Sequence, residues 1–258
     1  PQATYATNVM GTVNLLEAVR GSETVRAVVN VTSDKCYQNT GTRRGYREED
    51  PMGGEDPYSS SKGCAELVTS AYRNSFFAPG DDAGVQLASA RAGNVIGGGD
   101  WAEDRLVPDI MQGMLEGREV AIRSPRAVRP WQFVLEPLAG YLLLAERLWE
   151  EGGEYAEGWN FGPPEESARS VGWIVERLTG RWNGETSWAS DTREHPSEAH
   201  YLKLDSTKAR RRLSWDSVLE LPAALEWIVQ WYEGYAQGAD VRRLCDEQIE
   251  RYEKRLRR

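Results

Sequence analysis

Few side chains in this chain of 258 residues could bind a transition metal or form a disulfide, because it has only three cysteines and two histidines. Cys36, Cys64 and Cys245 lack the close paired spacing of a zinc site and are too few for a disulfide framework. We therefore expect no metal site, and we expect a reducing compartment, the cytoplasm.

Long apolar runs are also missing. No run approaches the roughly 20 residues that a membrane-spanning helix needs, and the mean hydropathy is -0.60, so we expect no membrane interaction. The net charge of -9 argues against non-specific binding of nucleic acid. The basic tail, residues 251–258, follows an acidic stretch and is typical of a solvated helix face. Local arginines can still bind a phosphorylated small molecule within such an acidic protein.

A third absence concerns dinucleotide binding. No glycine-rich turn joins a first strand to a first helix, which is where the pyrophosphate of a dinucleotide binds. The run Gly97-Gly98-Gly99 follows a strand but comes late and opens no strand–helix–strand unit, so it predicts a flexible loop on the substrate side. Gly53-Gly54 predicts only a turn.

The pattern of apolar residues predicts alternating helices and strands in the first part of the chain. Helices are expected at residues 5–19 and 58–77, and buried strands at 25–31 and 85–91. This order favours an α/β fold, a Rossmann-like, doubly wound sheet with parallel strands and right-handed crossovers.

After the glycine run the composition changes, and most of the ten tryptophans lie in the second half. The second half predicts short strands and helices at residues 106–116, 119–122, 137–150, 159–162, 171–179, 206–213 and 221–237. The helix at 137–150 returns to the first layer, and most of the others form a smaller α+β domain. We expect residues 1–95 and about 131–160 to form the first domain. Residues 96–130 and 161–258 would form the second.

Tyr58 and Lys62 form the first candidate catalytic pair. Pro57 opens the predicted helix, and a spacing of four places both side chains on one helix face. A lysine ammonium beside a phenol favours the phenolate, so Tyr58 could act as a base near neutral pH.

The segment Ser33-Asp34-Lys35 follows the apolar strand at residues 25–31, separated from it by Thr32 alone. A hydroxyl at the carboxyl end of that strand could complete a proton relay with Tyr58 and Lys62. Asp34 and Lys35 add an acid and a base that simple hydride transfer does not require. The structural alternatives are a strand-end cap at Ser33 and a turn cap at Asp34.

Several segments resemble consecutive landmarks of the extended short-chain dehydrogenase/reductases, namely residues 8–18, the segment around Ser33, Tyr58-x-x-x-Lys62 and residues 91–95. Within that superfamily, residues 32–37, 56–59, 93–101 and 198–205 resemble the CDP-glucose 4,6-dehydratases. The resemblance runs in order along essentially the whole chain. It implies NAD as cofactor, CDP-glucose as substrate and a homodimer built on helices 5–19 and 58–77.

The same resemblance implies that the first strands, with the glycine-rich NAD fingerprint and the acidic ribose contact, lie upstream of Pro1. On this expectation the sequence is either a fragment of a longer protein or a truncated reading frame. What remains would be the second part of the NAD-binding domain together with the nucleotide-sugar domain.

The resemblance also assigns chemical roles. Tyr58 would take the proton of the sugar 4-hydroxyl during hydride transfer to NAD, Lys62 would lower the pKa of Tyr58 and bind the nicotinamide ribose, and Ser33 would hold the 4-oxygen. Asp34 would protonate the leaving 6-hydroxyl, which requires a site that keeps it neutral. Asn8 would support the relay from its helix and, with Tyr58 and Lys62, would belong to the cofactor-binding residues.

Lys35 departs from the broader dehydratase pattern, in which a glutamate commonly stands at this position as the base for the C5 proton. A lysine can act as that base only if desolvation or a neighbouring cation lowers its pKa. By resemblance, the lysine favours CDP-glucose over dTDP-glucose.

Four further residues are candidates for substrate binding. Asn94, at the carboxyl end of a strand, would contact the sugar diphosphate, and Arg129 resembles the arginine that contacts the nucleotide or diphosphate. Arg105 offers a second guanidinium for bidentate phosphate binding. His200 lies in the carboxyl-terminal substrate segment, with a structural role as its alternative.

Two other functions stay open from the sequence. Another nucleotide-sugar 4,6-dehydratase or a 4-epimerase would use Ser33 and Tyr58, and an epimerase would not need Asp34 and Lys35. A non-catalytic sugar-nucleotide-binding module would account for the missing glycine-rich turn.

Overall fold

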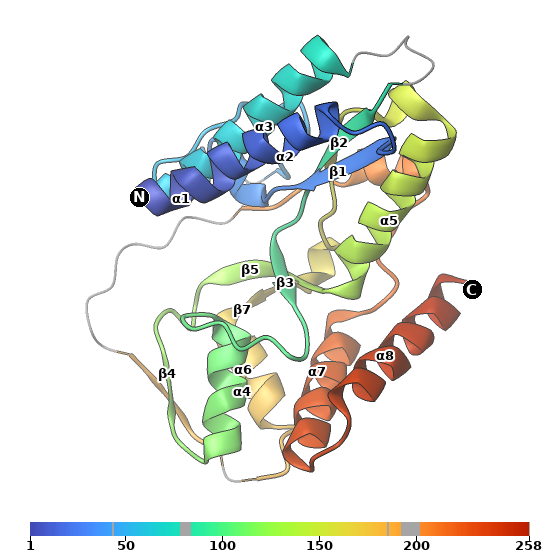
Figure 1. Ribbon diagram of the computed structural model, residues 1–258. Coiled ribbons are helices and arrows are strands. Elements are labelled where there is room, and N and C mark those ends of the chain that lie inside the picture. The colour runs from blue at the N-terminus through green and yellow to red at the C-terminus, as the bar shows by residue number, and fades with distance from the viewer. Residues whose placement is uncertain (43, 78–83, 185, 192–201, 258) are drawn as a thin grey trace. The chain divides into compact units, whose positions relative to one another are not determined.

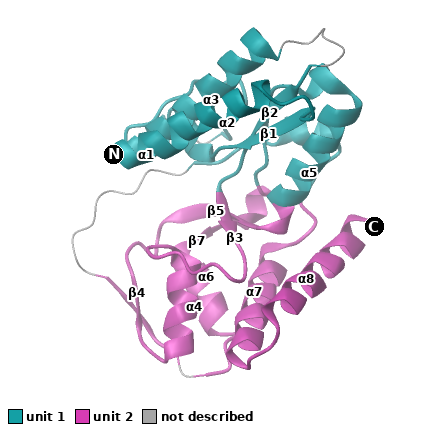
Figure 2. Cartoon of the chain, viewed as in Figure 1, with its two compact units in different colours: residues 1–93, 137–162, 202–216 teal, residues 94–136, 163–201, 217–258 magenta. Residues whose placement is uncertain are grey.

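The computed structural model describes residues 1–42, 44–77, 84–184, 186–191 and 202–257. The chain divides into two compact units, each built from three separate segments (Figure 2). Unit 1 contains residues 1–93, 137–162 and 202–216, and unit 2 contains residues 94–136, 163–201 and 217–258. No helix among the described residues is long and apolar enough to cross a membrane.

A parallel sheet forms the centre of unit 1. Its strands are β1 (Ala27–Val31), β2 (Gln86–Arg91) and β6 (Gly158–Asn160), in the order β1-β2-β6. Val29 lies opposite Ala88, and Ala90 lies opposite Trp159. The predicted parallel arrangement is confirmed, because a helix lies between each strand and the next along the chain.

Helices cover both faces of this sheet (Figure 1). On one face lie α3 (Pro57–Phe76) and a continuous helical stretch formed by α1 (Gln2–Tyr5), the π-helical η1 (Ala6–Met10) and α2 (Gly11–Arg20). On the other face lies α5 (Leu135–Glu150), whose first two residues belong to unit 2.

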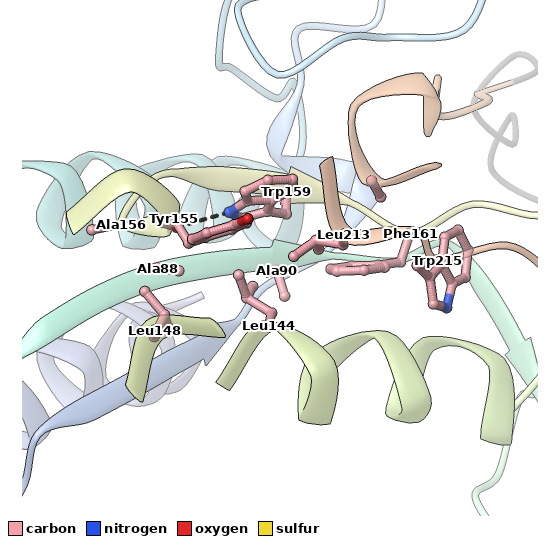
Figure 3. Close-up of a cluster of buried hydrophobic side chains, with 11 residues drawn as sticks. Ala88, Ala90, Leu144, Leu148, Tyr155, Ala156, Trp159, Phe161, Leu213 and Trp215 are labelled. Carbon is pink, nitrogen blue, oxygen red and sulfur yellow. Dashed lines mark hydrogen bonds between the residues drawn. The ribbon is translucent and has the colours of Figure 1, made fainter. Parts of the chain in front are cut away.

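Strand β2 separates two apolar clusters because successive side chains on a strand point to opposite faces. Leu87 packs with Leu16 of α2. Ala88 and Ala90 instead pack with Leu144 and other side chains from α5 and the segments around it (Figure 3). That second cluster also includes Leu148, Tyr155, Ala156, Trp159, Phe161, Ala209, Leu213 and Trp215. Both faces of the central strand are therefore dry, as a parallel sheet requires.

Short segments complete unit 1. The 3-10 helices η2 (Asp34–Cys36) and η3 (Gly152–Tyr155) follow β1 and α5, and the π-helical η5 (Ala209–Leu213) stands where a helix at residues 206–213 was predicted.

Unit 2 combines short strands with longer helices. Its strands are β3 (Asn94–Ile96), β4 (Val120–Ile122), β5 (Val128–Phe133), β7 (Ala168–Ser170) and β8 (Trp188–Ser190). β5 pairs in parallel with β3 and antiparallel with β7, while β4 pairs in parallel with β8. Its helices are α4 (Leu106–Glu116), α6 (Val171–Thr179), α7 (Leu221–Ala236) and α8 (Val241–Leu256), with the 3-10 helix η4 (Glu165–Ser167) before β7.

The run Gly97-Gly98-Gly99 differs from the flexible loop that the sequence predicted. A Cβ atom at Gly98 would lie 2.4 Å from Cγ of Trp231, and one at Gly97 would lie 2.8 Å from Cγ1 of Val134. Gly99 adopts a φ of 75° beside the same indole. Gly98 and Gly99 are therefore needed for close packing against α7, since a side chain there would displace Trp231, and Gly97 makes room for Val134.

The compact units also divide the chain differently from the expected domains. Residues 202–216 join unit 1 rather than the second domain, because Leu204 forms a β-bridge with Tyr46, and Leu202 packs into a cluster with Tyr37. Residues 131–136, expected in the first domain, belong to unit 2, because β5 pairs with β3 and β7. These boundaries depend on tertiary pairing, which the pattern along the chain does not contain.

Candidate active site

The first group of candidate residues lies where β1 ends. The backbone N–H groups of Thr32 and Asp34 donate to the carbonyls of Ala90 and Ala92, so the chain stays aligned with β2 beyond the strand itself. Ser33 then caps η2: its hydroxyl accepts from the N–H of Lys35 at 3.2 Å and donates to Oδ1 of Asp34 at 3.0 Å. Ser33 is 8% exposed and Asp34 5% exposed.

Gly93 gives the Asp34 carboxyl its space. A Cβ atom at Gly93 would lie 2.9 Å from Oδ2 of Asp34, closer than ordinary van der Waals contact. A glycine here therefore lets a carboxyl occupy a buried position beside the end of β2.

The second group stands on the first turns of α3. Asp56 caps this helix by accepting from the N–H groups of Tyr58 at 2.9 Å and Ser59 at 3.0 Å, and Pro57 occupies the first helical position. Although partial burial acts in the opposite direction, hydrogen bonds from Ser59 and Tyr58 and the charge of Lys35 lower the pKa of Asp56. The cap thus fixes the backbone that carries Tyr58.

Tyr58 and Lys62 are close together, as their spacing predicted. Nζ of Lys62 lies 5.9 Å from the centre of the Tyr58 ring, and the Tyr58 side chain is 48% exposed. Burial lowers the pKa of Lys62. Among the described residues, Lys62 has no hydrogen-bond acceptor or ion-pair partner, so its ammonium group can donate to a ligand.

Glycines bring the two groups side by side. A Cβ atom at Gly63 on α3 would lie 3.3 Å from the carbonyl oxygen of Cys36 in η2. The N–H of Gly53 donates to that same carbonyl at 2.8 Å. The chain segment from Ser33 to Cys36 therefore packs directly against the helix that carries Lys62.

A buried ion pair joins these elements, and sequence reasoning missed it. Glu66, one helical turn after Lys62 and 4% exposed, accepts from Arg91 at 2.8 and 3.0 Å, from Ser89 at 2.7 Å and from Thr32. Burial alone would raise the pKa of Glu66, but the bonds and charge of Arg91 lower it. A charged residue inside the apolar pattern of α3 and another at the end of that of β2 are the signal that could have revealed the pair.

Tyr37 extends this network below η2. Its hydroxyl accepts from Nη1 of Arg91 at 2.5 Å and donates to Oδ1 of Asn160 at 2.8 Å, and the Asn160 amide in turn donates to the carbonyl of Tyr46 at 2.9 Å. Burial raises the pKa of Tyr37, so this hydroxyl stays neutral. The network links α3, the sheet and the loop after η2.

Asn8 reaches α3 through a serine. Its side-chain amide donates to Oγ of Ser61 at 2.9 Å, and that hydroxyl donates to the carbonyl of Tyr58 at 2.7 Å. This contact agrees with a supporting position rather than a direct chemical one.

Two of the four candidate substrate-binding residues line one cavity, of about 190 Å³, inside unit 2. They are Asn94 at the start of β3 and Arg129 on β5. Arg105 precedes α4, does not line the cavity, and pairs with Asp100 at 3.8 Å. His200 lies outside the described residues.

The parallel sheet covered by helices and the Tyr58-x-x-x-Lys62 pair on α3 are features of the short-chain dehydrogenase/reductase class. A family model described as GDP-mannose 4,6 dehydratase matches residues 1–226. CDP-glucose 4,6-dehydratase of Salmonella typhimurium is 55% identical over 243 residues, which cover 93% of this chain and 68% of that protein. The chain therefore belongs to the nucleotide-sugar 4,6-dehydratase family.

More distant relatives share the fold. dTDP-glucose 4,6-dehydratase of Streptomyces griseus is 26% identical, over 88% of this chain and 64% of that protein. A crystal structure of dTDP-glucose 4,6-dehydratase from Bacillus anthracis with NAD has a TM-score of 0.72 and 24% identity, over 91% of this chain and 70% of the other. UDP-glucose 4-epimerase from Thermotoga maritima has a TM-score of 0.72 and 20% identity, over 90% and 71%. The chain spans about two thirds of the length of these proteins.

Proposed function

We propose that this chain carries the acid–base and substrate-binding groups of an NAD-dependent dehydratase that converts CDP-glucose to CDP-4-keto-6-deoxyglucose. The observation that carries this proposal is its 55% identity with a CDP-glucose 4,6-dehydratase. The reaction oxidises C4 of the glucose, eliminates water across C5 and C6, and returns the hydride to C6 and a proton to C5.

Lys62 and Tyr58 are the proposed residues at the nicotinamide end of NAD. Lys62 has a half-buried ammonium group without a described acceptor, which suits a ribose hydroxyl, and it lies beside the Tyr58 ring. The cofactor, when bound, accepts the C4 hydride and later gives it back. Tyr58 is the proposed base that takes the proton of the 4-hydroxyl, and Lys62 is the cation beside it.

Ser33 and Asp34 supply the groups that oxidation alone would not need. The hydroxyl of Ser33 donates a hydrogen bond to the 4-oxygen as the ketone forms. The C4 ketone then makes the C5 proton more acidic. Asp34 then gives its proton to the leaving 6-hydroxyl, which departs as water. The burial of Asp34 beside Gly93 suits a carboxyl that must carry a proton near neutral pH.

Lys35 is the proposed base for the C5 proton. Its backbone N–H is bonded to the Ser33 hydroxyl, so the side chain starts directly beside the acid Asp34. Lys35 is partly buried. Because the C4 ketone stabilises the enolate that forms when the C5 proton leaves, a weak base is sufficient.

Asn94 and Arg129 are the proposed ligands of the sugar diphosphate. Both line the cavity of unit 2, and a guanidinium together with an amide suits the oxygens of a diphosphate. Arg105 is proposed as a second phosphate ligand from the loop before α4, where its side chain is 65% exposed.

A product assay tests the proposal. The chain is incubated with CDP-glucose and NAD, and the expected 4-keto-6-deoxy product absorbs in strong alkali. An epimerised hexose does not absorb in strong alkali. If it formed in place of the keto product, the 4-epimerase alternative would be correct. Binding of CDP-glucose without turnover and without NAD binding would instead indicate a non-catalytic sugar-nucleotide-binding module.

We also propose that the chain forms a homodimer through α2 and α3. These helices lie next to one another in unit 1 (Figure 1). Each exposes a large apolar side chain, Leu15 on α2 and Leu67, 61% exposed, on α3. Such side chains gain free energy when a partner removes them from water. Sedimentation of the Leu67→Glu variant tests this, because a charge at the interface should convert the dimer to monomer.

A further inference from the structure

The cavity of unit 2 is small and mixed in character. At about 190 Å³ it is below the roughly 300–1,000 Å³ of sites that enclose whole drug-sized ligands, so it fits one part of a nucleotide sugar. Its apolar walls come from β4, β5 and the first turns of α4 and α6. The lining side chains are Asn94, Asp104, Leu106, Asp109, Ala121, Ile122, Arg123, Ser124, Arg129, Trp131 and Val171.

The two carboxylates of this cavity have different partners. Asp104 forms an ion pair with Arg123. Asp109, in the first turn of α4, has no hydrogen-bond or ion-pair partner for its side chain among the residues that the structure describes. It is the carboxylate in the cavity whose acceptor capacity is left for a ligand.

Asp109 departs from the usual behaviour of a first-turn acid. An acid at this place normally gains stability as an anion from the helix dipole. Here partial burial, followed by the negative charge of Asp104, raises the pKa of Asp109. A ligand that donates a hydrogen bond to this carboxylate would offset the cost of its burial.

Pyrimidine bases differ in the group that they would present to Asp109. Cytosine carries an exocyclic amine, a donor, at the position where thymine and uracil carry a carbonyl oxygen, an acceptor. A carboxylate accepts from the amine but repels the carbonyl oxygen. The side chains of Ile122 and Val171 supply the apolar surface that a flat base needs.

We propose that Asp109 accepts a hydrogen bond from the exocyclic amine of cytosine and thereby selects a cytidine nucleotide over uridine and thymidine nucleotides. This inference rests on the proposed function, because it assumes that the cavity holds the nucleotide part of a nucleotide sugar. It assigns a specificity-determining role to a residue that the sequence shows only as an acid near the start of a helix.

Calorimetric binding of CDP, UDP and dTDP to the full chain tests the proposal. The unchanged protein should bind CDP at least about tenfold more tightly than UDP, the discrimination expected of one good base contact. In Asp109→Asn this ratio should fall toward one, because the new amide can donate to the carbonyl oxygen of uracil. Comparing ratios within one protein cancels a general loss of binding.

The control is Glu116→Gln, at the exposed end of the same helix, which should keep the ratio unchanged. A CDP analogue with pyrimidin-2-one as base, lacking the amine, tests the unmutated protein and should bind about tenfold more weakly than CDP. Equal binding of this analogue, or an unchanged ratio in Asp109→Asn, overturns the role of Asp109 alone. Failure of the unmutated chain to bind any of the three diphosphates would overturn the proposed function itself.

Discussion

Two carboxylates, one in each unit, show how differently the two regions treat a negative charge. Glu66 in unit 1 is almost fully buried, yet Arg91, Ser89 and Thr32 satisfy it and Arg91 lowers its pKa. Asp109 in unit 2 is less buried, yet it has no described partner and its pKa is raised by burial and by Asp104. A carboxylate whose hydrogen bonds are satisfied within the fold holds its neighbouring elements together, whereas a carboxylate without such bonds can accept one from a ligand.

The largest effect on stability is expected from removing one partner of the Glu66–Arg91 ion pair. Glu66→Ala should reduce the free energy of unfolding by about 3–5 kcal/mol, because it leaves the Arg91 guanidinium buried without its counter-charge. Urea denaturation measures this. Glu23→Ala, at an exposed position of the same unit, should change the stability by less than about 0.5 kcal/mol. Equal effects of both substitutions would show that the buried pair does not hold α3 in place.

Tyr58 should separate activity from stability within the same unit. Tyr58→Phe removes the proposed base while keeping the ring, so kcat should fall by about 10²–10⁴-fold. The melting temperature should stay unchanged, since the Tyr58 side chain is about half exposed. The alkaline product assay and a thermal melt measure the two quantities. Full activity in this variant would contradict the assignment of Tyr58 as the base.

Gly93 tests whether Asp34 needs the exact space that it occupies. Gly93→Ala places a Cβ atom about where the carboxyl lies, so it should cost about 1–3 kcal/mol of stability through overpacking. In the single variant the carboxyl must move, and dehydration should slow as well. The double variant Gly93→Ala with Asp34→Ala should recover much of the lost stability but none of the activity. No recovery would mean that the strain arises elsewhere.

The sequence predicted the parts of the molecule whose signal is local. Apolar runs at 25–31 and 85–91 became β1 and β2, and the spacing of Tyr58 and Lys62 placed them together on α3. Strands β3, β5, β7 and β8 were missed. Three of them have only three residues, a length that rarely shows a period, and β5 begins with the polar and proline residues Arg129 and Pro130 after Val128.

Tertiary context accounts for the features that sequence reasoning missed. Residues 202–216 join unit 1 through the pairing of Leu204 with Tyr46. The roles of Glu66 and Asp109 depend on which groups surround each carboxyl once the chain has folded. Both are acids on helices in the sequence, and within the described part of the chain only Glu66 of the two forms an ion pair with an arginine.

The smallest expected effect is on the pH dependence of stability, where Asp109 and Glu66 can be compared directly. A group with a raised folded-state pKa stabilises the fold while protonated, and this contribution is lost as the pH rises through that pKa. Ionised Asp109 should therefore cost a little stability at neutral pH, and Asp109→Asn should increase the free energy of unfolding, within about 0.5 kcal/mol. Glu66 has a lowered pKa, so its contribution should instead be lost as the pH falls. Urea denaturation from pH 4 to 8 measures both effects. At neutral pH, Glu66→Gln should lower the free energy of unfolding and Asp109→Asn should raise it, because of these two ionised carboxylates only Glu66 has a partner in the fold among the described residues.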